Sequence, residues 1–276
     1  MTSLLQQSVG AHAPLGQKSP YPQEYNSALL HPVSRQQQRR AMGFATQEFL
    51  GFDEWNCFEL AWLNPQGKPI RTCARFLIPA MSPYLPESKS VKLYLHSLNS
   101  QKFNTHAQAL SIIEKDLSNI CQAQVKAEFD ASSFYNINSN LDYFCLDNLD
   151  IKINDYTHNS NLLKADSTHI VQEKVYSHLF KSHCLCTGQP DWGSIFIEYQ
   201  GPKIAHESIL AYLISFHNHQ GFSENCIEQI FVDINNICKP SLLSIFGRFT
   251  RRGGIEINPY RSNYLVSSPT WRLSVQ

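Results

Sequence analysis

The sequence predicts an α+β fold in which antiparallel strands and helices come in separate runs. Strand-like segments follow one another across short turns, and helical segments come after them. No Gly-x-Gly-x-x-Gly stretch follows a strand, and the chain has no Walker loop. These observations argue against a doubly wound nucleotide fold, so a dinucleotide would have to be held in another way.

The first half contains two strands and one clear helix. Residues 1–45 are rich in Gln, Pro, Ser and Arg without periodicity, which predicts an extended arm. Strands are expected over Trp55–Leu63 and Ile70–Ile78, with a turn between them. A helix is expected from about Thr105, because one face at helical spacing is apolar. That face consists of Leu110, Ile113, Leu117 and Ile120.

The second half follows a similar plan. Ala131–Asp166 is dense in Asn, Ser and Asp and is expected to be a long connection with at least one short strand. Ser194–Gln200 alternates like a strand, and Gly201-Pro202 is expected to turn the chain. Further strands are expected over Leu242–Phe249 and around Ile255–Ile257. Two helix faces are predicted, one from Ile209, Leu210, Leu213 and Phe216, the other from Ile227, Ile230, Phe231, Ile234 and Ile237.

An internal repeat links the two halves. Asp116-Leu-Ser-Asn-Ile-Cys121 matches Asp233-Ile-Asn-Asn-Ile-Cys238, each at the end of a predicted helix, and a phenylalanine stands eight residues after each cysteine. This indicates duplication of a strand-strand-helix-helix-strand-strand unit. The predicted organisation is an arm over 1–45, a first module over 46–150 and a second over 151–276.

Composition narrows the classes of function. The 276 residues are 42% hydrophobic, and 23 basic residues balance 23 acidic ones. A general nucleic-acid or membrane-surface binder would need a basic excess. The N-terminus lacks the pattern of a secretion signal, and the longest apolar run is too short to cross a bilayer. The eight cysteines are then expected to be reduced thiols in the cytoplasm.

The most informative segment is Ser182-His-Cys-Leu-Cys-Thr-Gly-Gln-Pro-Asp-Trp-Gly-Ser194. It places Cys184 seven residues ahead of Asp191, across a turn that leads into a strand. A thiolate attacks electrophiles, and its free pKa of roughly 8.5 is lowered in suitable surroundings. The pattern favours covalent chemistry with protonation of the adduct. The alternative is a cysteine that only packs as a small hydrophobe.

Three other polar segments allow both a functional and a structural interpretation. Pro86–Lys92 offers a carboxylate for a heterocycle edge and two cations for phosphate, or it is the solvated start of a strand. Arg248–Gly254 combines three arginines with a glycine pair, which suits phosphate groups or a hairpin turn. Phe222-Ser223-Glu224 begins a helix, with Ser223 as a credible N-cap.

His183, Cys184 and Cys186 could be part of a zinc site, but no second pair of ligands completes a structural site.

Together these motifs resemble the two-module form of the NADPH-dependent 7-cyano-7-deazaguanine reductases, the nitrile reductases of queuosine biosynthesis. The resemblance covers nearly the whole chain. It rests on the Cys184–Ser194 stretch, Glu-Ser-Lys-Ser at 87–90, Phe-x-Glu at 222–224, Arg-Arg-Gly-Gly at 251–254, Ile-Asn-Pro-Tyr-Arg-Ser at 257–262 and Trp-Leu-Asn-Pro-Gln-Gly-Lys-Pro at 62–69. It implies tandem T-fold modules, each an antiparallel sheet carrying two helices on one face, a homodimer, and a site shared between modules.

The resemblance also implies a mechanism and residue roles. Cys184 attacks the nitrile carbon to give a thioimide, Asp191 donates a proton, and two NADPH reduce the carbon to an aminomethyl group without a metal. Pro86, Glu87, Ser88, Ser223 and Glu224 correspond to substrate-binding positions. Ser88, Lys89, Arg252 and Gly253 correspond to cofactor-contacting positions.

One departure from the family pattern concerns Ser223, because the family usually has histidine there. Serine cannot titrate near neutral pH, and His217 or His219 could substitute. This change motivates one alternative, a deazaguanine-binding protein with little turnover. A second alternative, supported only by the grouping of His183, Cys184 and Cys186, is a zinc-dependent, cyclohydrolase-like T-fold enzyme.

Overall fold

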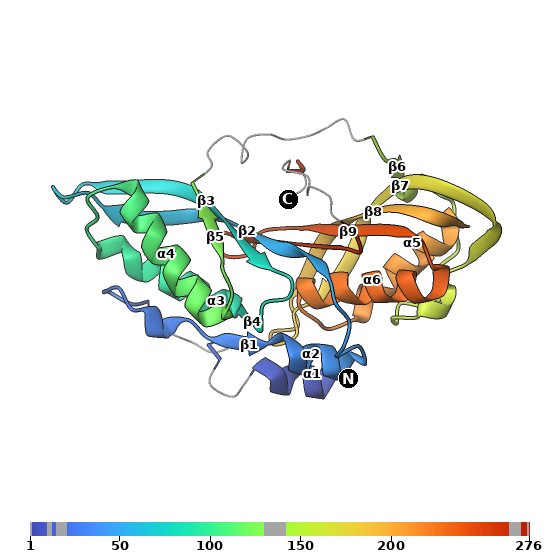
Figure 1. The fold of residues 1–276 in the computed structure, drawn as a ribbon, viewed down its shortest axis with the longest axis horizontal. Helices are drawn as coiled ribbons and strands as arrows, with labels where there is room; N and C mark the ends of the chain where they lie inside the picture. The colour runs from blue at the N-terminus through green and yellow to red at the C-terminus, as the bar shows by residue number, and fades with distance from the viewer. Residues whose placement is uncertain (1, 10–12, 15–20, 130–141, 265–271, 275) are drawn as a thin grey trace. The chain divides into compact units, whose positions relative to one another are not determined.

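The computed structural model describes residues 2–9, 13–14, 21–129, 142–264, 272–274 and 276 (Figure 1). The first half contains α1 (Thr2–Val9), β1 (Pro32–Ser34), α2 (Arg35–Met42), β2 (Leu50–Leu63), β3 (Pro69–Pro79), β4 (Tyr84–Pro86), α3 (Ser88–Ser97), α4 (His106–Cys121) and β5 (Lys126–Glu128). The second half contains β6 (Phe144–Cys145), β7 (Ala165–His183), β8 (Pro190–Ile204), α5 (His206–Ile214), α6 (Ser223–Cys238), β9 (Leu242–Phe249) and β10 (Ile255–Ser262). Short 3₁₀ turns include η1 (Ser27–Leu29), η2 (Leu98–Ser100), η4 (Leu146–Asn148), η5 (Ser160–Leu162) and η6 (Ser215–Asn218).

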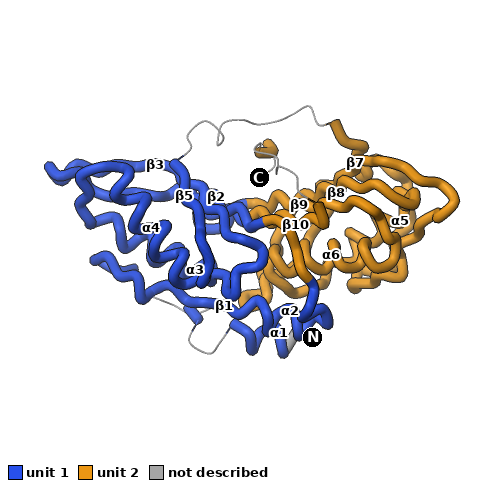
Figure 2. Tube along the Cα trace, in the orientation of Figure 1, with its two compact units in different colours: residues 1–47, 52–136, 251–257 blue, residues 48–51, 137–250, 258–276 orange. Residues whose placement is uncertain are grey.

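The chain forms two compact units, neither of which is one continuous stretch (Figure 2). Unit 1 comprises residues 1–47, 52–136 and 251–257, and unit 2 comprises residues 48–51, 137–250 and 258–276. Unit 1 therefore includes a short segment from near the end of the chain. A single cut at residue 150 does not separate the two units.

Unit 1 is a mixed α+β structure with an antiparallel sheet. Its strands lie in the order β5-β3-β2, and α3 and α4 cover one face (Figure 1). Thr105 caps α4 by accepting the N–H of Gln108, which confirms the predicted helix start. The helices bury their apolar faces on the inward side chains of the strands. Strand members of this core are Trp55, Cys57, Trp62, Ala74, Phe76 and Ile78, and helix members include Val91, Tyr94, Leu95, Ile113 and Leu117.

Unit 2 repeats the architecture with longer strands. The order is β10-β9-β8-β7-β6, with all pairs antiparallel except the short β6, which runs parallel to β7. Directly opposed aromatic rings of Tyr176, Phe196 and Phe246 stack across β7, β8 and β9, with ring planes 10° and 3° apart. The predicted apolar face of α6 is buried except at Ile237, which is 40% exposed near the end of the helix.

The two helices at the end of each repeat share one hydrogen-bond pattern. In unit 1 the carboxylate of Asp116 accepts hydroxyl groups from Tyr25 and Tyr94, both at 2.7 Å. In unit 2 Asp233 accepts the Tyr212 hydroxyl at 2.7 Å and lies 2.8 Å from His158 Nε2. The residues that follow α4 and α6, Gln122 and Lys239, both adopt left-handed backbone conformations. The predicted repeat is thus matched by equivalent contacts in three dimensions.

Three sequence expectations about local structure were wrong. Gly201 and Pro202 lie inside β8 opposite Val171 and Ile170, because the β7–β8 hairpin extends past them to a register shift that accommodates proline. Pro86–Lys92 enters a helix and not a strand, since Glu87 caps α3. Residues 1–45 contain α1, β1 and α2 instead of only an extended arm. Helix α2 buries Arg35, Gln38 and Arg39, so it has no apolar stripe for sequence analysis to detect.

The expected long connection over 131–166 is described only in part. Residues 130–141 lie outside the described residues, and the remainder contains β6, η4, η5 and the first residues of β7. No helix in the described ranges is long and apolar enough to cross a membrane.

Candidate active site

The cysteine predicted as nucleophile lies in the turn between β7 and β8. Cys184 directly follows β7 and is buried. Its N–H donates to the carbonyl of Gln189 at 2.8 Å, and its carbonyl accepts the N–H of Gly188 at 3.0 Å. Gly188 has a φ of +66°, a conformation that glycine adopts without strain. The turn is therefore closed by main-chain hydrogen bonds that hold Cys184 at the end of the hairpin.

The predicted proton donor lies on the adjacent strand. Asp191, the second residue of β8, is the direct cross-strand partner of Ser182. Cross-strand partners project from the same face of a sheet, and alternate residues along a strand share a face. The hairpin thus places Asp191 on the face that carries Ser182, two residues before Cys184.

A second cysteine, Cys226 on α6, lies close to these groups. Its side chain lies near Ser182, whose influence on the pKa of Cys226 is to lower it. Burial is the main cause that raises the pKa of Cys226 to about 12, and the negative charges of Asp191 and Glu224 raise it in the same direction. Cys226 is therefore a neutral thiol at neutral pH, and its surroundings include both acidic residues.

The segment that leads into α6 is joined to the strand end that carries Cys184. The N–H of His183 donates to the carbonyl of His219 at 2.8 Å, and the N–H of Gly221 donates to the carbonyl of His183 at 3.1 Å. Helix α6 begins at Ser223 with Phe222 as its N-cap, so the prediction that Ser223 is the N-cap was wrong. The Ser223 hydroxyl lies 3.3 Å from a carboxylate oxygen of Glu224, which is buried. In unit 2 the end of the hairpin that carries Cys184 therefore lies close to the start of α6.

The two histidines considered as substitutes for the missing histidine at position 223 are uncharged at neutral pH and carry no proton of an imidazolium to donate. Burial is the main cause that lowers the pKa of His219 to about 4, and nearby His158 contributes. Burial, together with nearby Lys181, also lowers the pKa of His217. The His217 ring instead meets the edge of Trp192, with the ring centres 6.1 Å apart. Both rings are consistent with packing roles.

In unit 1 the predicted substrate carboxylate caps a helix. Glu87 is buried, and its carboxylate accepts the N–H groups of Lys89 at 2.6 Å and Ser90 at 2.9 Å. Burial raises the pKa of Glu87, although these hydrogen bonds oppose the shift. Pro86 is buried at the end of β4, and Ser88 and Lys89 are half-buried in the first turn of α3.

One of the predicted cofactor residues, Gly253, lines a small cavity in unit 1. Gly253 and Gly254 have φ angles of +58° and +79°. A Cβ on Gly253 would stand 2.7 Å from Nζ of Lys92, which lies one turn along α3 from Ser88. The cavity, of about 40 Å³, is lined by Cys57, Glu59, Lys92, Leu95, His96, Gly253, Gly254 and Ile255. Lys92 therefore connects the first turn of α3 with the glycine turn.

The predicted site residues thus fall into two groups. Cys184, Asp191, Ser223 and Glu224 belong to unit 2, whereas Pro86, Glu87, Ser88, Lys89, Arg252 and Gly253 belong to unit 1. The group of His183, Cys184 and Cys186 does not form a metal site, since no cluster of three or more potential ligands occurs among the described residues. Nδ1 of His183 lies 2.9 Å from the Gly188 carbonyl instead.

Sequence reasoning missed the contact of Ser182 with Cys226. Strand alternation from Cys184 could have indicated which face Ser182 shares. The contact itself joins β7 to α6 across about forty residues of chain, so no local pattern indicates it.

Comparison with known proteins identifies the family of the chain. Residues 21–129 match the family model described as "Nitrile reductase, 7-cyano-7-deazaguanine-reductase N-term", and residues 190–265 match the "QueF-like protein" model. These matches place the chain in the class of nitrile reductases.

Relatives named NADPH-dependent 7-cyano-7-deazaguanine reductase align over nearly the full length. The protein of Hydrogenovibrio crunogenus is 47% identical over 91% of both chains. That of Chromohalobacter salexigens is 44% identical over 94% of both, and that of Paraburkholderia xenovorans is 44% identical over 93% of this chain and 95% of its own. The chain belongs to the 7-cyano-7-deazaguanine reductase family.

Proposed function

We propose that this protein is an NADPH-dependent nitrile oxidoreductase of tRNA queuosine biosynthesis. It reduces the nitrile of 7-cyano-7-deazaguanine to the aminomethyl group of 7-aminomethyl-7-deazaguanine. The observation that carries the proposal is the β7–β8 hairpin, which bears Cys184 and Asp191 at one end in a chain 44–47% identical to reductases of that name.

The chemistry begins with the Cys184 thiolate. Its sulfur adds to the nitrile carbon, and the nitrile nitrogen takes a proton from Asp191, which gives a covalent thioimide. NADPH, when bound, supplies a hydride for each of the two reductions. After the first, the carbon–sulfur bond breaks, Cys184 leaves as a thiolate and an imine forms. The second hydride adds to the imine carbon, and a proton from solvent goes to the nitrogen to give the amine, so two NADPH are used per product.

Substrate recognition falls to the two buried carboxylates. Glu87 in unit 1 and Glu224 in unit 2 are each proposed to accept hydrogen bonds from donors on the guanine-like edge. Pro86, Ser88 and Ser223 are proposed as further substrate-binding residues. An analogue without those donors should bind poorly, because buried carboxylates would lose their partners.

The residues proposed for the cofactor fit a phosphate-bearing ligand. A Cβ on Gly253 would meet Nζ of Lys92, so glycine lets this cation lie close against the backbone of the turn. Lys89, Lys92 and Arg252 provide the positive charge that phosphates require. No step needs a metal.

The proposal extends to the architecture and setting. We infer that each unit is a T-fold module, because each has a largely antiparallel sheet with two helices and an aspartate that accepts a tyrosine hydroxyl from the other helix. T-fold sheets join edge to edge, which favours a homodimer. All eight cysteines are free, in keeping with the reducing cytoplasm.

The direct experiment incubates the purified protein with NADPH and the nitrile. Two NADPH should be consumed for each aminomethyl product, and Cys184→Ala should abolish both consumption and the covalent adduct. A folded protein that consumes no NADPH at any pH between about 5 and 9 would exclude the proposal. An adduct on Cys184 without turnover would instead indicate a binding protein. In that case Ser223→His should restore reduction if the missing histidine is the cause.

A further inference from the structure

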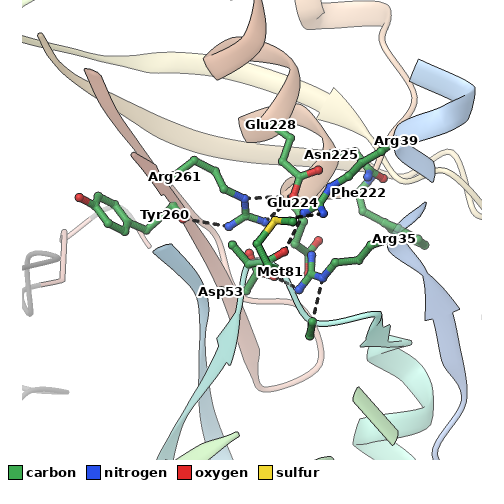
Figure 3. A network of polar contacts seen from close by, with 12 residues as sticks. Arg35, Arg39, Asp53, Met81, Phe222, Glu224, Asn225, Glu228, Tyr260 and Arg261 are labelled. Atoms are coloured by element: carbon green, nitrogen blue, oxygen red, sulfur yellow. Dashed lines mark hydrogen bonds and ion pairs between the residues drawn. The ribbon is translucent and has the colours of Figure 1, made fainter. Parts of the chain in front are cut away.

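The helix that carries Glu224 is attached to the sheet of unit 2 one turn further along. Glu228 follows Glu224 by four residues and therefore lies on the same face of α6. Its carboxylate accepts two hydrogen bonds from Arg261 on β10, from Nε at 3.0 Å and from Nη2 at 2.8 Å (Figure 3). Both side chains are almost fully buried, at 2% and 0% exposure.

The guanidinium of Arg261 is itself fixed on other sides. Its Nη1 donates to the carbonyl of Tyr260 at 2.9 Å, and its centre lies 5.9 Å from the ring centre of Phe49. Phe49 in turn meets the edge of Phe231, two turns along α6 from Glu224, with ring centres 5.5 Å apart. Helix α6 therefore cannot slide or rotate against β10 without breaking charge-assisted hydrogen bonds in a buried setting.

We propose that Glu228 and Arg261 are positioning residues that set the height and rotation of the substrate-binding end of α6. Neither group is assigned contact with the substrate. They act through the helix, holding the Glu224 carboxylate and Ser223 in the geometry that the deazaguanine edge requires. The inference rests on the proposed function, because that function makes Glu224 a substrate ligand.

The test measures steady-state kinetics of Glu228→Gln in the full-length protein. Glutamine keeps the size of the side chain and one acceptor but removes the charge. The KM for the nitrile is expected to rise about tenfold with kcat changed less than about threefold, since small displacements of a binding group weaken binding strongly. The KM for NADPH should stay unchanged, because the proposed cofactor residues lie in unit 1.

The matched control is Asp233→Asn on the same helix. Asp233 is also buried and hydrogen-bonded, but it lies more than two turns beyond Glu224 and contacts Tyr212 and His158. The Asp233→Asn variant should lower the melting temperature as much as Glu228→Gln does, but its KM for the nitrile should equal that of wild type. Arg261→Lys, which keeps the charge and loses the fork, should raise that KM by an intermediate factor.

The outcomes separate this inference from the proposed function. A wild-type protein that does not reduce the nitrile overturns the function. A wild-type protein that does reduce it, with an unchanged nitrile KM in Glu228→Gln, overturns the positioning role. The positioning role is also overturned if the nitrile KM rises equally in Asp233→Asn. It is overturned as well if Glu228→Gln raises the KM for NADPH as much as the KM for the nitrile. If Glu228→Gln fails to fold, the nitrile KM of Arg261→Lys decides by the same criteria.

Discussion

Gly253 shows how a single missing side chain shapes the proposed cofactor region. Its backbone is left-handed, and the space where a Cβ would stand is occupied by the ammonium end of Lys92. Any other residue would be strained at this φ and would also push Lys92 aside. The glycine is thus needed for conformation and for space.

Gly253→Ala is accordingly expected to raise the KM for NADPH at least several-fold and to lower stability by about 1 kcal/mol. Steady-state kinetics and thermal unfolding measure the two effects. Gly67→Ala is the control, because Gly67 has a φ of +86° but no atom lies within 4 Å of the point where its Cβ would stand. The control should lose similar stability with an unchanged KM. Equal KM values in Gly253→Ala and wild type would contradict the assignment.

Glu87 gives a prediction about pH. Burial raises its pKa, so the carboxylate gains a proton at a higher pH than an ordinary glutamate, whose pKa is roughly 4.3. Only the ionised form accepts hydrogen bonds at both oxygens. The affinity for the nitrile should therefore weaken as the pH falls through this raised pKa.

The measurement compares the nitrile KM of wild type and Glu87→Gln across a pH range of about 5 to 8. The variant should bind more weakly near neutral pH, and the ratio of the two KM values should shrink towards acid pH as wild type loses its charge. A ratio that stays constant across the range would show that ionised Glu87 does not contact the substrate.

At the scale of elements, α4 and α6 end in the same way although neither ends in glycine. Gln122 and Lys239 have φ angles of 52° and 49°, which disfavour residues with a Cβ. Glycine is the usual residue at this position because it avoids that strain.

Gln122→Gly should therefore stabilise the protein by up to about 1 kcal/mol, seen as a higher melting temperature. Gln124→Gly is the matched control, since Gln124 is also exposed and has no positive φ. The control should destabilise slightly, because glycine only adds freedom to the unfolded chain there. A loss of stability in both variants would mean that the left-handed strain at Gln122 is negligible.

Strong apolar periodicity explains which elements the sequence predicts. Helices α4 and α6 and strand β9 have one apolar face each and were placed within about two residues. Strand β7 was not predicted because residues 165–170 are all exposed and show no alternation of apolar and polar side chains. Helix α3 has helical spacing at Val91, Tyr94, Leu95 and Leu98, but the polar start of the helix suggested a strand.

In the candidate site, too, local motifs indicate some residues, whereas other features depend on tertiary contacts. The motif itself indicates Cys184 and Asp191, because they share one hairpin. By contrast, the neighbourhood of Cys226 and the anchoring of α6 by Arg261 come from tertiary contacts that no local pattern contains. The site residues of both groups remain predictions for the experiments above.

For the whole molecule, the discontinuous units have a consequence for cutting the chain. Unit 1 includes residues 251–257, where Ile255 joins the core, Gly254 accepts the N–H of Phe58, and Glu256 accepts the side-chain amide of Asn56. A fragment of residues 1–150 lacks all three contacts.

That fragment should unfold at a lower temperature than the same fragment fused to residues 251–257 through a flexible linker. The lost burial and hydrogen bonds amount to a few kcal/mol. Circular dichroism during heating measures the difference. If the two fragments have the same melting temperature, residues 251–257 contribute nothing to the stability of unit 1.

The two units share a further contact besides those of Asp116 and Asp233, which allows their differences to be located. In both units a serine in the first turn of the preceding helix donates its hydroxyl to the residue before that helix: Ser90 to Glu87 at 2.6 Å and Ser208 to Ala205 at 2.7 Å. The two copies can therefore be compared position by position. They agree at Tyr94 and Tyr212, whose hydroxyls both donate to an aspartate. They differ at Glu87 and Ala205, because only the residue before α3 has a carboxylate that caps its helix.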